Sequence, residues 1–472
     1  MPGKRLRVDT FTDMLDVIII SFVLLVTIGT GFYTSRKSSG EADSYIVSDR
    51  NMGLFTFVAV NVSTWYGGIL GIGEYSYRYG ISSWFTQGLP YYIFAFIFAF
   101  LFAGKVRSTG LLSIPAKLRI EYNNKVAIVA SILIFTITSP APYLLTAAQI
   151  IATIFDVPVD LMLFVIPIPL IIYLSIGGFR SNIKVDVFLF FFMFAGFIAA
   201  GIYLFTTHGG MPFLEQKLPA EHLSLTGGSS FFYLLVWYLV AAWTIADPGF
   251  HQRVYAAKTA QIAKKGILIS ILLWALFDFF TNATGLFARA LLPDLQNPVS
   301  AFPALAAGYL PVGIKGLFLA SLFATVYTTL NSFIFLSGVT FSNDIVKEIV
   351  PAEKFHLKRY TAVGMILSTL IAIILSLTLR SIVDIWYYIG SLFVPALIFL
   401  ITGAYFKKFK QGNGLAMLQL IFIPVSGLIW IIFRKEFPAD SFLSQVEPMI
   451  IGLLTGGVIY LIGWLKNHFL TR

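Results

Sequence analysis

The sequence predicts an all-α protein that crosses a lipid bilayer many times, and three observations carry this prediction. Hydrophobic residues make up 57% of the 472 residues and charged residues only 12%, about half of the roughly 25% that soluble domains carry. Apolar stretches of about 20 residues, the length that spans a bilayer, recur along the whole chain. No long polar insertion separates them. A soluble globule and a disordered chain are therefore both excluded.

Thirteen segments are long and apolar enough to be transmembrane helices. They are residues 13–35, 53–79, 83–106, 124–154, 158–176, 182–206, 229–248, 259–291, 311–346, 355–379, 381–404, 413–433 and 447–469. An odd number places the two ends of the chain on opposite sides of the membrane. If the N-terminus is outside, the inside loops hold 23 of the 33 Lys and Arg residues, in keeping with the positive-inside rule. We therefore expect an outside N-terminus and a cytoplasmic C-terminus in the cell membrane, although Lys4, Arg5 and Arg7 favour the reverse.

Composition also excludes several classes of function. The net charge of +10 follows from the basic inside loops, so we expect no nucleic-acid partner. With no cysteine, the chain has no disulfide framework, Cys-rich zinc site or thiol nucleophile. Five His residues without a His-Glu-x-x-His or paired-carboxylate motif argue against an enzyme. The expected partners are a small-molecule solute and the lipid bilayer, and no obligate protein partner is indicated.

Two of the predicted helices carry interruptions inside the bilayer. The second span reads NVSTWYGGILGIGE from Asn61 to Glu74, with four glycines and several polar residues. The seventh ends in Asp247-Pro248-Gly249, where proline removes a backbone donor and clashes with the preceding turn. A broken membrane helix is tolerated where its freed backbone lines a cavity. Close helix packing by the glycines and a loop at the membrane edge are the alternative explanations.

The interruptions fall at matching places in two halves of one transporter domain, 1–472. The second span opens a group of five over 53–206, and the seventh opens a second group of five over 229–404. One helix at 13–35 precedes these groups, and two at 413–469 follow them. Repeats with an odd number of spans insert in opposite orientations, and paired broken helices mark the midplane site of secondary transporters.

The ninth span carries a stripe of hydroxyl groups. Thr325, Thr328, Thr329 and Ser332 have the i, i+3, i+4, i+7 spacing that puts them on one helical face, with Asn331 beside them. Such oxygens suit small hard cations, and the broken second span would add carbonyl oxygens. In isolation the hydroxyls could instead bond to carbonyls one turn earlier or pack between helices.

Two acidic residues within the spans are further candidates. Asp186 lies just inside the sixth span, and a carboxylate in a bilayer is a functional candidate by default because it is costly. Its alternative is a pair with Arg180 or Lys184 at the membrane interface. Glu74 is expected to pair with Arg78 at the i, i+4 spacing, at the outer end of the second span.

Three stretches match signatures of a known family of transporters. DPGFHQRVYAAK (247–258) looks like a Gln-Arg-x-x-x-Ala-Lys signature, and YLSIGGFRSNIKVD (173–186) resembles a Gly-Gly stretch that ends in Asp. TTLNSFIFLSGVTFSND (328–344) resembles a sodium-site helix followed by an acidic residue. These are signatures of the sodium:solute symporters, the family of bacterial sodium–galactose, sodium–proline and sialic acid transporters, and the resemblance covers nearly the whole chain.

The resemblance implies a LeuT-type core of two inverted five-helix repeats and a Na+ site between the second and ninth spans. The matching ligands are the backbone carbonyls of Asn61, Thr64 and Thr325 and the side chains of Thr328 and Thr329. Some members have a second Na+ site, whose matching positions here are Asp186, Thr328, Asn331 and Ser332. Asn331 replaces the usual hydroxyl there. Na+ is the expected coupling ion.

The sequence therefore predicts a sodium-coupled secondary active symporter that imports a small polar organic solute, such as a sugar or an amino acid, by alternating access. The expected substrate contacts are Trp65, Gly68, Glu74, Gln87, Tyr91, Gln149, Trp243 and Asp247. Asp247 is expected to be an unpaired carboxylate at the break, which disfavours a substrate carboxylate beside it. A proton-coupled or uncoupled transporter is the main alternative, and a sodium-dependent sensor is a lesser one. The hydroxyls of the ninth span favour Na+, because they do not titrate near neutral pH.

Overall fold

The computed structural model describes residues 13–36, 41–379, 381–438 and 441–469. Over these ranges the chain is helical, with no strand and one isolated β-bridge between Met52 and Ala257. The all-α prediction is therefore confirmed.

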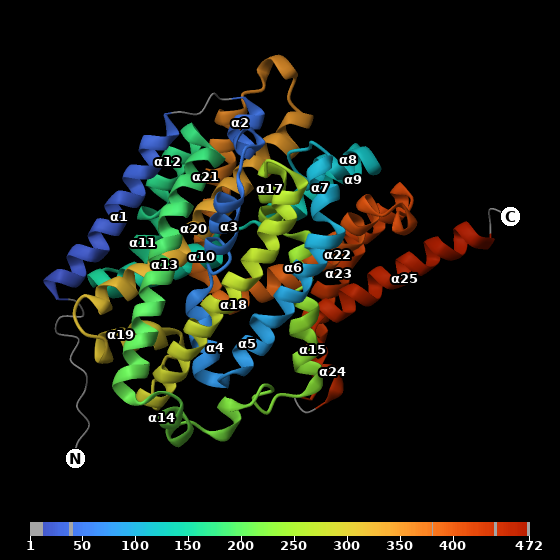
Figure 1. Cartoon of the computed structure of the whole chain (residues 1–472). Coiled ribbons are helices and arrows are strands. Elements are labelled where there is room, and N and C mark those ends of the chain that lie inside the picture. Colours follow the sequence, from blue (N-terminus) through green and yellow to red (C-terminus); the bar gives the residue numbers. More distant parts are fainter. Residues whose placement is uncertain (1–12, 37–40, 380, 439–440, 470–472) are drawn as a thin grey trace.

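The first half of the chain contains α1 (Met14–Ser35), α2 (Ala42–Val47), α3 (Leu54–Ser63), α4 (Ile69–Tyr79), α5 (Ser82–Gln87), α6 (Leu89–Leu101), α7 (Ala103–Ser108), α8 (Ile114–Glu121), α9 (Asn124–Ile137), α10 (Ala141–Phe155), α11 (Val159–Val165), α12 (Pro167–Gly177), α13 (Phe179–His208) and α14 (Gly210–Lys217). The second half contains α15 (Phe231–Val240), α16 (Trp243–Ala246), α17 (Pro248–Ala256), α18 (Ala260–Leu291), α19 (Ala301–Tyr309), α20 (Ile314–Val339), α21 (Leu357–Leu379), α22 (Ile382–Tyr405), α23 (Asn413–Phe433), α24 (Phe442–Gln445) and α25 (Pro448–Phe469). α1 lies at one edge of the molecule, and α23 and α25 lie at the opposite edge (Figure 1).

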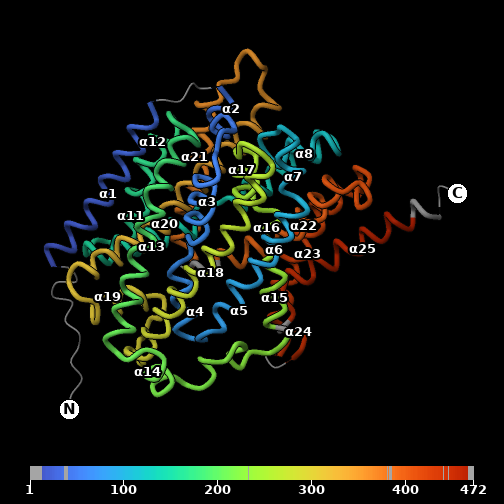
Figure 2. The backbone as a smooth tube through the Cα atoms, in the orientation of Figure 1, coloured from blue at the N-terminus to red at the C-terminus, as the bar shows by residue number. Residues whose placement is uncertain are grey.

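Twelve helices in the described part of the chain are long and apolar enough to cross a membrane. The predicted number of thirteen differs by one because of the broken second span. That span consists of α3, with 10 residues, and α4, with 11, and residues 64–68 separate them. Figure 2 shows the two short helices following one another through the molecule. The seventh span also differs from its predicted end at 248, because it continues through α17 to Ala256.

α20 is the central helix of the molecule. Within its most apolar stretch, 94% of the residues are buried, whereas α1 and α23 each bury only 28%. Its most extensive contact is with α13, and α10, α1 and α21 also pack against it. A helix that is buried on every side can present polar groups to its neighbours without exposing them to lipid. The hydroxyl stripe of the ninth span lies on this helix.

The outer helices expose apolar side chains, as expected in contact with lipid. Leu454 of α25 is 60% exposed and Ile432 of α23 is 61% exposed. Exposed apolar surface on this scale is unusual for a monomeric soluble protein. Together with the twelve long apolar helices, it identifies the chain as a multi-pass membrane protein.

A buried carboxylate anchors the extra N-terminal helix. Asp16 of α1 is fully buried and accepts hydrogen bonds from the backbone N–H groups of Gly313 and Gly316, both at 2.8 Å. Lys315 lies 3.3 Å from the other carboxylate oxygen of Asp16. A negative charge at the N-terminus of α20 satisfies amides that have no helical acceptor. This contact fixes α1 against the central helix.

Candidate cation and substrate sites

The break in the second span frees backbone oxygens in the middle of the protein. At the end of α3, the Trp65 N–H donates to the Val62 carbonyl at 3.3 Å, one residue short of the Asn61 carbonyl that a regular helix would use. Gly67 and Gly68 follow, and glycine disfavours helix continuation. The Asn61 side chain is fully buried, and neither of its polar atoms has a hydrogen-bond partner. The end of α3 thus brings oxygens that are not committed to helical hydrogen bonding to the break, among them the unpartnered side-chain oxygen of Asn61.

The hydroxyl stripe of α20 meets this break. The Thr328 hydroxyl donates to the Ser63 carbonyl at 2.7 Å, and the Thr329 hydroxyl donates to the Thr64 carbonyl at 3.1 Å. The same two hydroxyls lie 3.1 and 3.3 Å from the Thr325 carbonyl. All the predicted ligands of the first Na+ site are at most 4% exposed. Four of the five therefore lie at one junction, and the fifth, the Asn61 carbonyl, lies just before it in α3.

The chemistry of this junction fits a monovalent cation. Its donors are carbonyl and hydroxyl oxygens without formal charge, which suit a hard, singly charged ion, whereas Ca²⁺ and Mg²⁺ sites rely on carboxylates. Across the residues that the structure describes, no group of three or more His, Cys, Asp or Glu side chains could hold a metal ion. Each hydroxyl donates its hydrogen to a carbonyl and keeps two lone pairs, which can coordinate an ion.

Gly67 makes the close approach of the break to α20 possible. A Cβ atom at this position would lie 2.6 Å from Cβ of Thr329 and 2.5 Å from the Tyr143 ring. Both distances are far below van der Waals contact. Gly68 has a similar role on the other side of the break, where the Trp386 indole covers it. These glycines allow the backbone of the break to approach the neighbouring helices closely. Close helix packing and a break in the helix, which the sequence offered as alternatives, therefore occur together here.

Asp247 forms the restart of the seventh span. It is the N-cap of α17, and its Oδ1 accepts a hydrogen bond from the Phe250 N–H at 2.5 Å, with Pro248 at the first helical position. Asp at the N-cap followed by Pro is a favoured helix start. The expectation of an unpaired carboxylate is therefore wrong, because one oxygen caps the helix. The alternative of a loop at the membrane edge is also wrong, since the span continues to Ala256.

Aromatic side chains surround the two breaks. The Trp65 ring lies 5.3 Å from Tyr91, 6.1 Å from Phe250 and 4.7 Å from Trp274, measured between centroids. The Asp247 carboxylate interacts electrostatically with Tyr91 and Tyr143. Trp65, Tyr91 and Asp247 are only partly buried although they lie among buried residues. This combination of partial exposure and central position marks them as one candidate substrate site.

The remaining predicted substrate contacts are more dispersed. Trp243 packs against Gly390 of α22, which also carries Trp386. Gln87, one turn before Tyr91, has a buried amide nitrogen without a partner, and Gln149 has a buried amide oxygen without one. Glu74 accepts a hydrogen bond from Arg78 Nε at 2.9 Å, which confirms the predicted pair. Among the described residues, no recorded bond or ring contact joins Glu74 or Gln149 to the Trp65 group.

The residues of the predicted second Na+ site are only partly brought together. The Asn331 amide accepts from the Tyr173 hydroxyl at 2.5 Å and donates to Asn182, whose own amide donates to the Ser332 hydroxyl at 2.9 Å. Asp186 lies one turn after Asn182 on α13 and is fully buried, but neither of its oxygens has a hydrogen-bond partner. The alternative pairing of Asp186 with Arg180 or Lys184 is therefore not observed.

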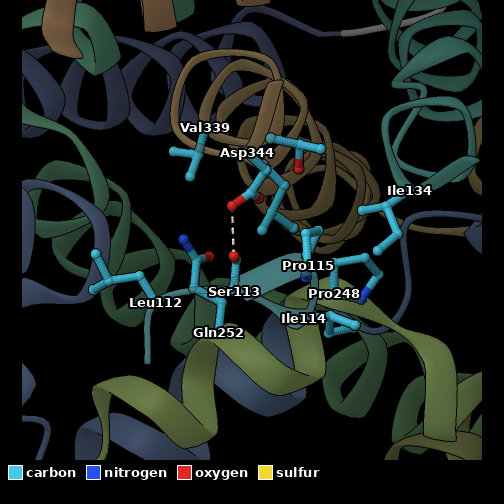
Figure 3. A pocket seen from close by; sticks show the side chains of 11 residues that line it. Leu112, Ser113, Ile114, Pro115, Ile134, Pro248, Gln252, Val339 and Asp344 are labelled. Atoms are coloured by element: carbon cyan, nitrogen blue, oxygen red, sulfur yellow. Dashed lines mark hydrogen bonds between the residues drawn. The ribbon is translucent and has the colours of Figure 1, made fainter. Parts of the chain in front are cut away.

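A separate cavity lies beyond the break of the seventh span. It is small, with a volume of about 20 Å³, and it is lined by residues of α8, α17, the end of α20 and the turn that follows α20, among them Pro248, Gln252 and Thr340. Figure 3 shows Asp344 and Ser113 facing each other across it, and the Ser113 hydroxyl donates to Asp344 Oδ1 at 2.6 Å. Arg119 of α8 forms an ion pair with Glu348 at 3.1 Å. The hydrogen bond and the ion pair thus hold α8 against the segment that follows α20.

Sequence reasoning missed three residues of these sites. Ser63 contributes its carbonyl to the junction, and Tyr143 and Trp386 complete the aromatic surroundings of the breaks. A carbonyl oxygen leaves no signal in the sequence, because every residue has one. The two aromatic residues come from α10 and α22, and their approach to Gly67 and Gly68 depends on packing between spans far apart in the chain.

The geometry defines a class of protein: a multi-pass membrane transporter whose candidate cation site lies between a broken helix and a hydroxyl-bearing helix. The model of the sodium:solute symporter family matches residues 45–422. The chain therefore belongs to the sodium:solute symporter family.

Several proteins with similar sequences are sodium-coupled transporters. The sodium/pantothenate symporter of Escherichia coli is 23% identical over 72% of this chain and 74% of its own length. The sodium/glucose cotransporter of Vibrio parahaemolyticus is 23% identical over 92% of this chain and 88% of its own length. The sodium/proline symporter 2 of Staphylococcus saprophyticus is 22% identical over 93% and 90%.

Solved structures show the same fold. A Na+-coupled sialic acid symporter in a substrate-bound outward-open state covers 96% of this chain and 98% of its own, with a TM-score of 0.80 and 16% identity. Mhp1, a nucleobase-cation-symport-1 family transporter, covers 91% and 96%, with a TM-score of 0.56 and 12% identity. The predicted LeuT-type fold is therefore confirmed.

Proposed function

We propose that this chain imports a small polar organic solute together with Na+, across the cell membrane, with its N-terminus outside and its C-terminus in the cytoplasm. The observation that carries the proposal is the meeting of the Thr328 and Thr329 hydroxyls with the carbonyls of Ser63 and Thr64 at the broken second span. Na+ bound there would be held by Thr328, Thr329 and the carbonyls of Asn61, Thr64 and Thr325. Its charge supplies the electrostatic attraction that draws the break onto α20.

Coupling follows from the position of this site. Residues 64–68 carry both a cation ligand, Thr64, and a candidate substrate contact, Trp65. An ion that orders the break also orders the substrate site, so each ligand raises the affinity for the other by the same factor. The two halves, 53–206 and 229–404, would supply the paired breaks of an inverted repeat, and transport would follow from one group of helices moving against the rest.

The chemistry of the aromatic site favours an uncharged or amine-bearing solute. Asp247 adds negative charge, and Gln87 offers a buried amide nitrogen without a partner. Trp65 and Tyr91 supply the flat apolar faces against which a sugar ring or an aliphatic amine packs. A solute carboxylate beside Asp247 would be repelled. We therefore propose a sugar, an amino acid or a related polar solute, with Gly68, Trp243, Gln149 and Glu74 as further contacts.

A second Na+ site at Asp186, Asn331 and Ser332 has less support. The Asn331 amide is engaged at both ends, by Tyr173 and Asn182. An ion could use the Asn331 oxygen only in competition with the Tyr173 hydroxyl. The unpartnered carboxylate of Asp186 is the observation in its favour.

The test is the thermal stability of the purified protein in Na+ compared with K+ at equal ionic strength. A ligand that binds only the folded state stabilises it, by about 2.7 kcal/mol at one hundred times its dissociation constant. We expect Na+ to raise the melting temperature, and at least one of glucose, galactose, proline and choline to raise it further, in Na+ only. Pantothenate, which carries a carboxylate and no amine, should have no such effect. Equal curves in Na+ and K+ would favour a proton-coupled or uncoupled transporter instead.

Replacement of Asp247 separates its two roles. Asp247→Ala removes both the cap and the charge, so we expect loss of sodium-dependent uptake and a decrease in stability of about 1 kcal/mol. Asp247→Asn keeps a capping side chain, so it should restore stability but not uptake. Transport is measured as uptake into proteoliposomes of the solute that stabilises the wild type most. Stability is measured from melting curves of the same protein samples. Wild-type uptake by Asp247→Ala would remove this residue from the substrate site.

The cavity beside α8 offers a reporter of alternating access. Because the chain has no cysteine, Thr340→Cys places a single thiol in the wall of the cavity, where Thr340 is 4% exposed. We expect slow labelling by a thiol reagent in Na+, and labelling several-fold faster when Ser113→Ala removes the hydrogen bond to Asp344. Equal labelling rates in the two proteins would mean that the bond does not hold this side closed.

A further inference from the structure

Two segments of the candidate substrate site share one arrangement of neighbouring aromatic residues. At the break of the second span, Trp65 is partly exposed and the next residue, Tyr66, is buried. On α6, Tyr91 is partly exposed and the next residue, Tyr92, is buried. The rings of Trp65 and Tyr91 lie 5.3 Å apart between centroids. In each pair, one side chain therefore belongs to the candidate site and its neighbour packs into the protein interior.

Both buried tyrosines are hydrogen-bonded to α18. The Tyr66 hydroxyl donates to the backbone carbonyl of Trp274 at 3.1 Å, and the Tyr92 hydroxyl donates to Oδ2 of Asp278. Trp274 and Asp278 have the i, i+4 spacing, so they lie on one face of α18, one turn apart. Both side chains are at most 3% exposed. One face of a single helix thus holds both segments of the candidate site.

The Asp278 carboxylate also lies against the start of α6. Gly88 separates α5 from α6, and a Cβ atom there would lie 2.7 Å from Asp278 Oδ2. The absence of a side chain at Gly88 therefore leaves the room that the carboxylate occupies. Gln87, whose buried amide nitrogen has no hydrogen-bond partner, comes directly before this glycine. Asp278 thus contacts the short stretch that carries two of the predicted substrate contacts, Gln87 and Tyr91.

α18 supports the opposite segment as well. The Trp274 ring lies 4.7 Å from the Trp65 ring between centroids, so Trp65 packs directly against this helix. Further along α18, the Asn282 amide donates to the Asp278 carbonyl at 2.8 Å and accepts from the Ser76 hydroxyl of α4 at 3.0 Å. α18 also packs along α3, α4 and α6. The separation of Trp65 from Tyr91 is therefore set by the contacts that each segment makes with α18.

We propose that Asp278 is a positioning residue for solute recognition, which holds Gln87 and Tyr91 in place relative to Trp65 through the hydrogen bond from Tyr92. The inference rests on the proposed function, because it assumes that the solute binds beside Trp65 and Tyr91. Asp278 acts through α6 and does not itself contact the solute. Binding sites need their contacts held to within about 0.5 Å by such supporting residues. Loss of the bond should therefore weaken solute binding.

Tyr92→Phe and Asp278→Ala test the proposal through the KM of Na+-driven uptake by proteoliposomes that contain the full chain. The probe is whichever of glucose, galactose, proline and choline stabilises the wild type most. We expect each variant to raise KM about tenfold, or about 1.4 kcal/mol, with the maximal rate per folded transporter within about twofold of the wild type. The double variant should be no weaker than the single ones, because both changes remove the same bond. A lower yield of folded protein with an unchanged KM would overturn the proposal.

Two further variants separate the hydrogen bond from other effects. Asp278→Asn keeps an oxygen that can accept from the Tyr92 hydroxyl, so its KM should stay within about threefold of the wild type. A KM as high as that of Asp278→Ala would show that the charge matters instead of the bond, and would overturn the proposal. Tyr45→Phe removes another buried hydroxyl, which donates to the Leu174 carbonyl at 3.0 Å. It should lower stability and leave KM unchanged. If Asp278→Ala fails to fold, Tyr92→Phe and Asp278→Asn still decide.

A thiol reporter gives a measurement that needs no solute. Because the chain has no cysteine, Gln87→Cys places a single thiol directly before Gly88. We expect a thiol reagent to label it several-fold faster when Tyr92→Phe is also present, since the start of α6 is then held less firmly. Equal labelling rates would contradict positioning by the bond. A wild type without any response to Na+ or to the four solutes would contradict the proposed function itself, and the labelling rates would still decide whether Asp278 holds α6.

Discussion

Thr328→Ala is expected to abolish most of the Na+ response of this protein. The hydroxyl of Thr328 lies 2.7 Å from the Ser63 carbonyl and 3.1 Å from the Thr325 carbonyl, so it is placed between the two helices that would hold the ion. Its removal leaves buried carbonyls with one donor fewer and one ligand fewer for Na+. We expect the half-saturating Na+ concentration to rise at least tenfold, or about 1.4 kcal/mol, with a parallel loss of uptake.

Thr328→Ser is the matched control for that variant. It keeps the hydroxyl and removes only a methyl group, so a Na+ response close to that of the wild type is expected. Thermal shift in Na+ and K+ measures both proteins. If Thr328→Ala responds to Na+ as the wild type does, the hydroxyls of α20 serve helix packing and the ion site must lie elsewhere.

Gly67→Ala is expected to disrupt the same site from the opposite side. The added Cβ would lie 2.6 Å from Thr329 Cβ and 2.5 Å from a ring carbon of Tyr143. Neither neighbour is the flexible end of a long side chain, so the break must move away from α20. Overpacking of this kind costs about 1–3 kcal/mol of stability. Separation of Thr64 from Thr329 should also raise the half-saturating Na+ concentration at least tenfold.

Gly457→Ala in α25 is the control for the glycine substitution. A Cβ atom there would meet nothing within 4 Å, and Ala is about 0.5–1 kcal/mol better than Gly inside a helix. This variant should be as stable as the wild type or slightly more so, with an unchanged Na+ response. Melting curves with and without Na+ compare the two variants. A Gly67→Ala protein with normal Na+ affinity would show that close approach of the break to α20 is unnecessary.

The spans and the hydroxyl stripe could be predicted because both are local properties. A run of apolar residues about 20 long has few stable conformations other than a membrane helix, and the spacing of Thr325, Thr328 and Thr329 places them on one face of any helix. Likewise, the breaks at Gly67 and at Pro248 follow from the backbone chemistry of glycine and proline. The residues involved are neighbours in the chain, so no knowledge of distant packing was needed.

The partners of these residues could not be predicted in the same way. Asp247 was expected to be an unpaired carboxylate, but it caps α17. Asp186 was expected to share an ion site with Asn331, but the side-chain amide of Asn331 is hydrogen-bonded to Tyr173 and Asn182. Each outcome depends on the exact rotation of one helix against another. A rotation of 100° per residue along a helix changes which side chain faces a neighbour, and apolar composition does not specify that rotation.

The sequence by itself determined that this chain is a helical membrane transporter, where its spans run and which helices carry polar groups into the bilayer. These are consequences of hydrophobic burial and backbone hydrogen bonding, which act within a segment. Only the tertiary structure decided that the Ser63 carbonyl meets Thr328, that Trp386 covers Gly68 and that Tyr143 lies against Gly67. Those contacts join spans that are distant in the chain, and close packing of all the helices at once selects them.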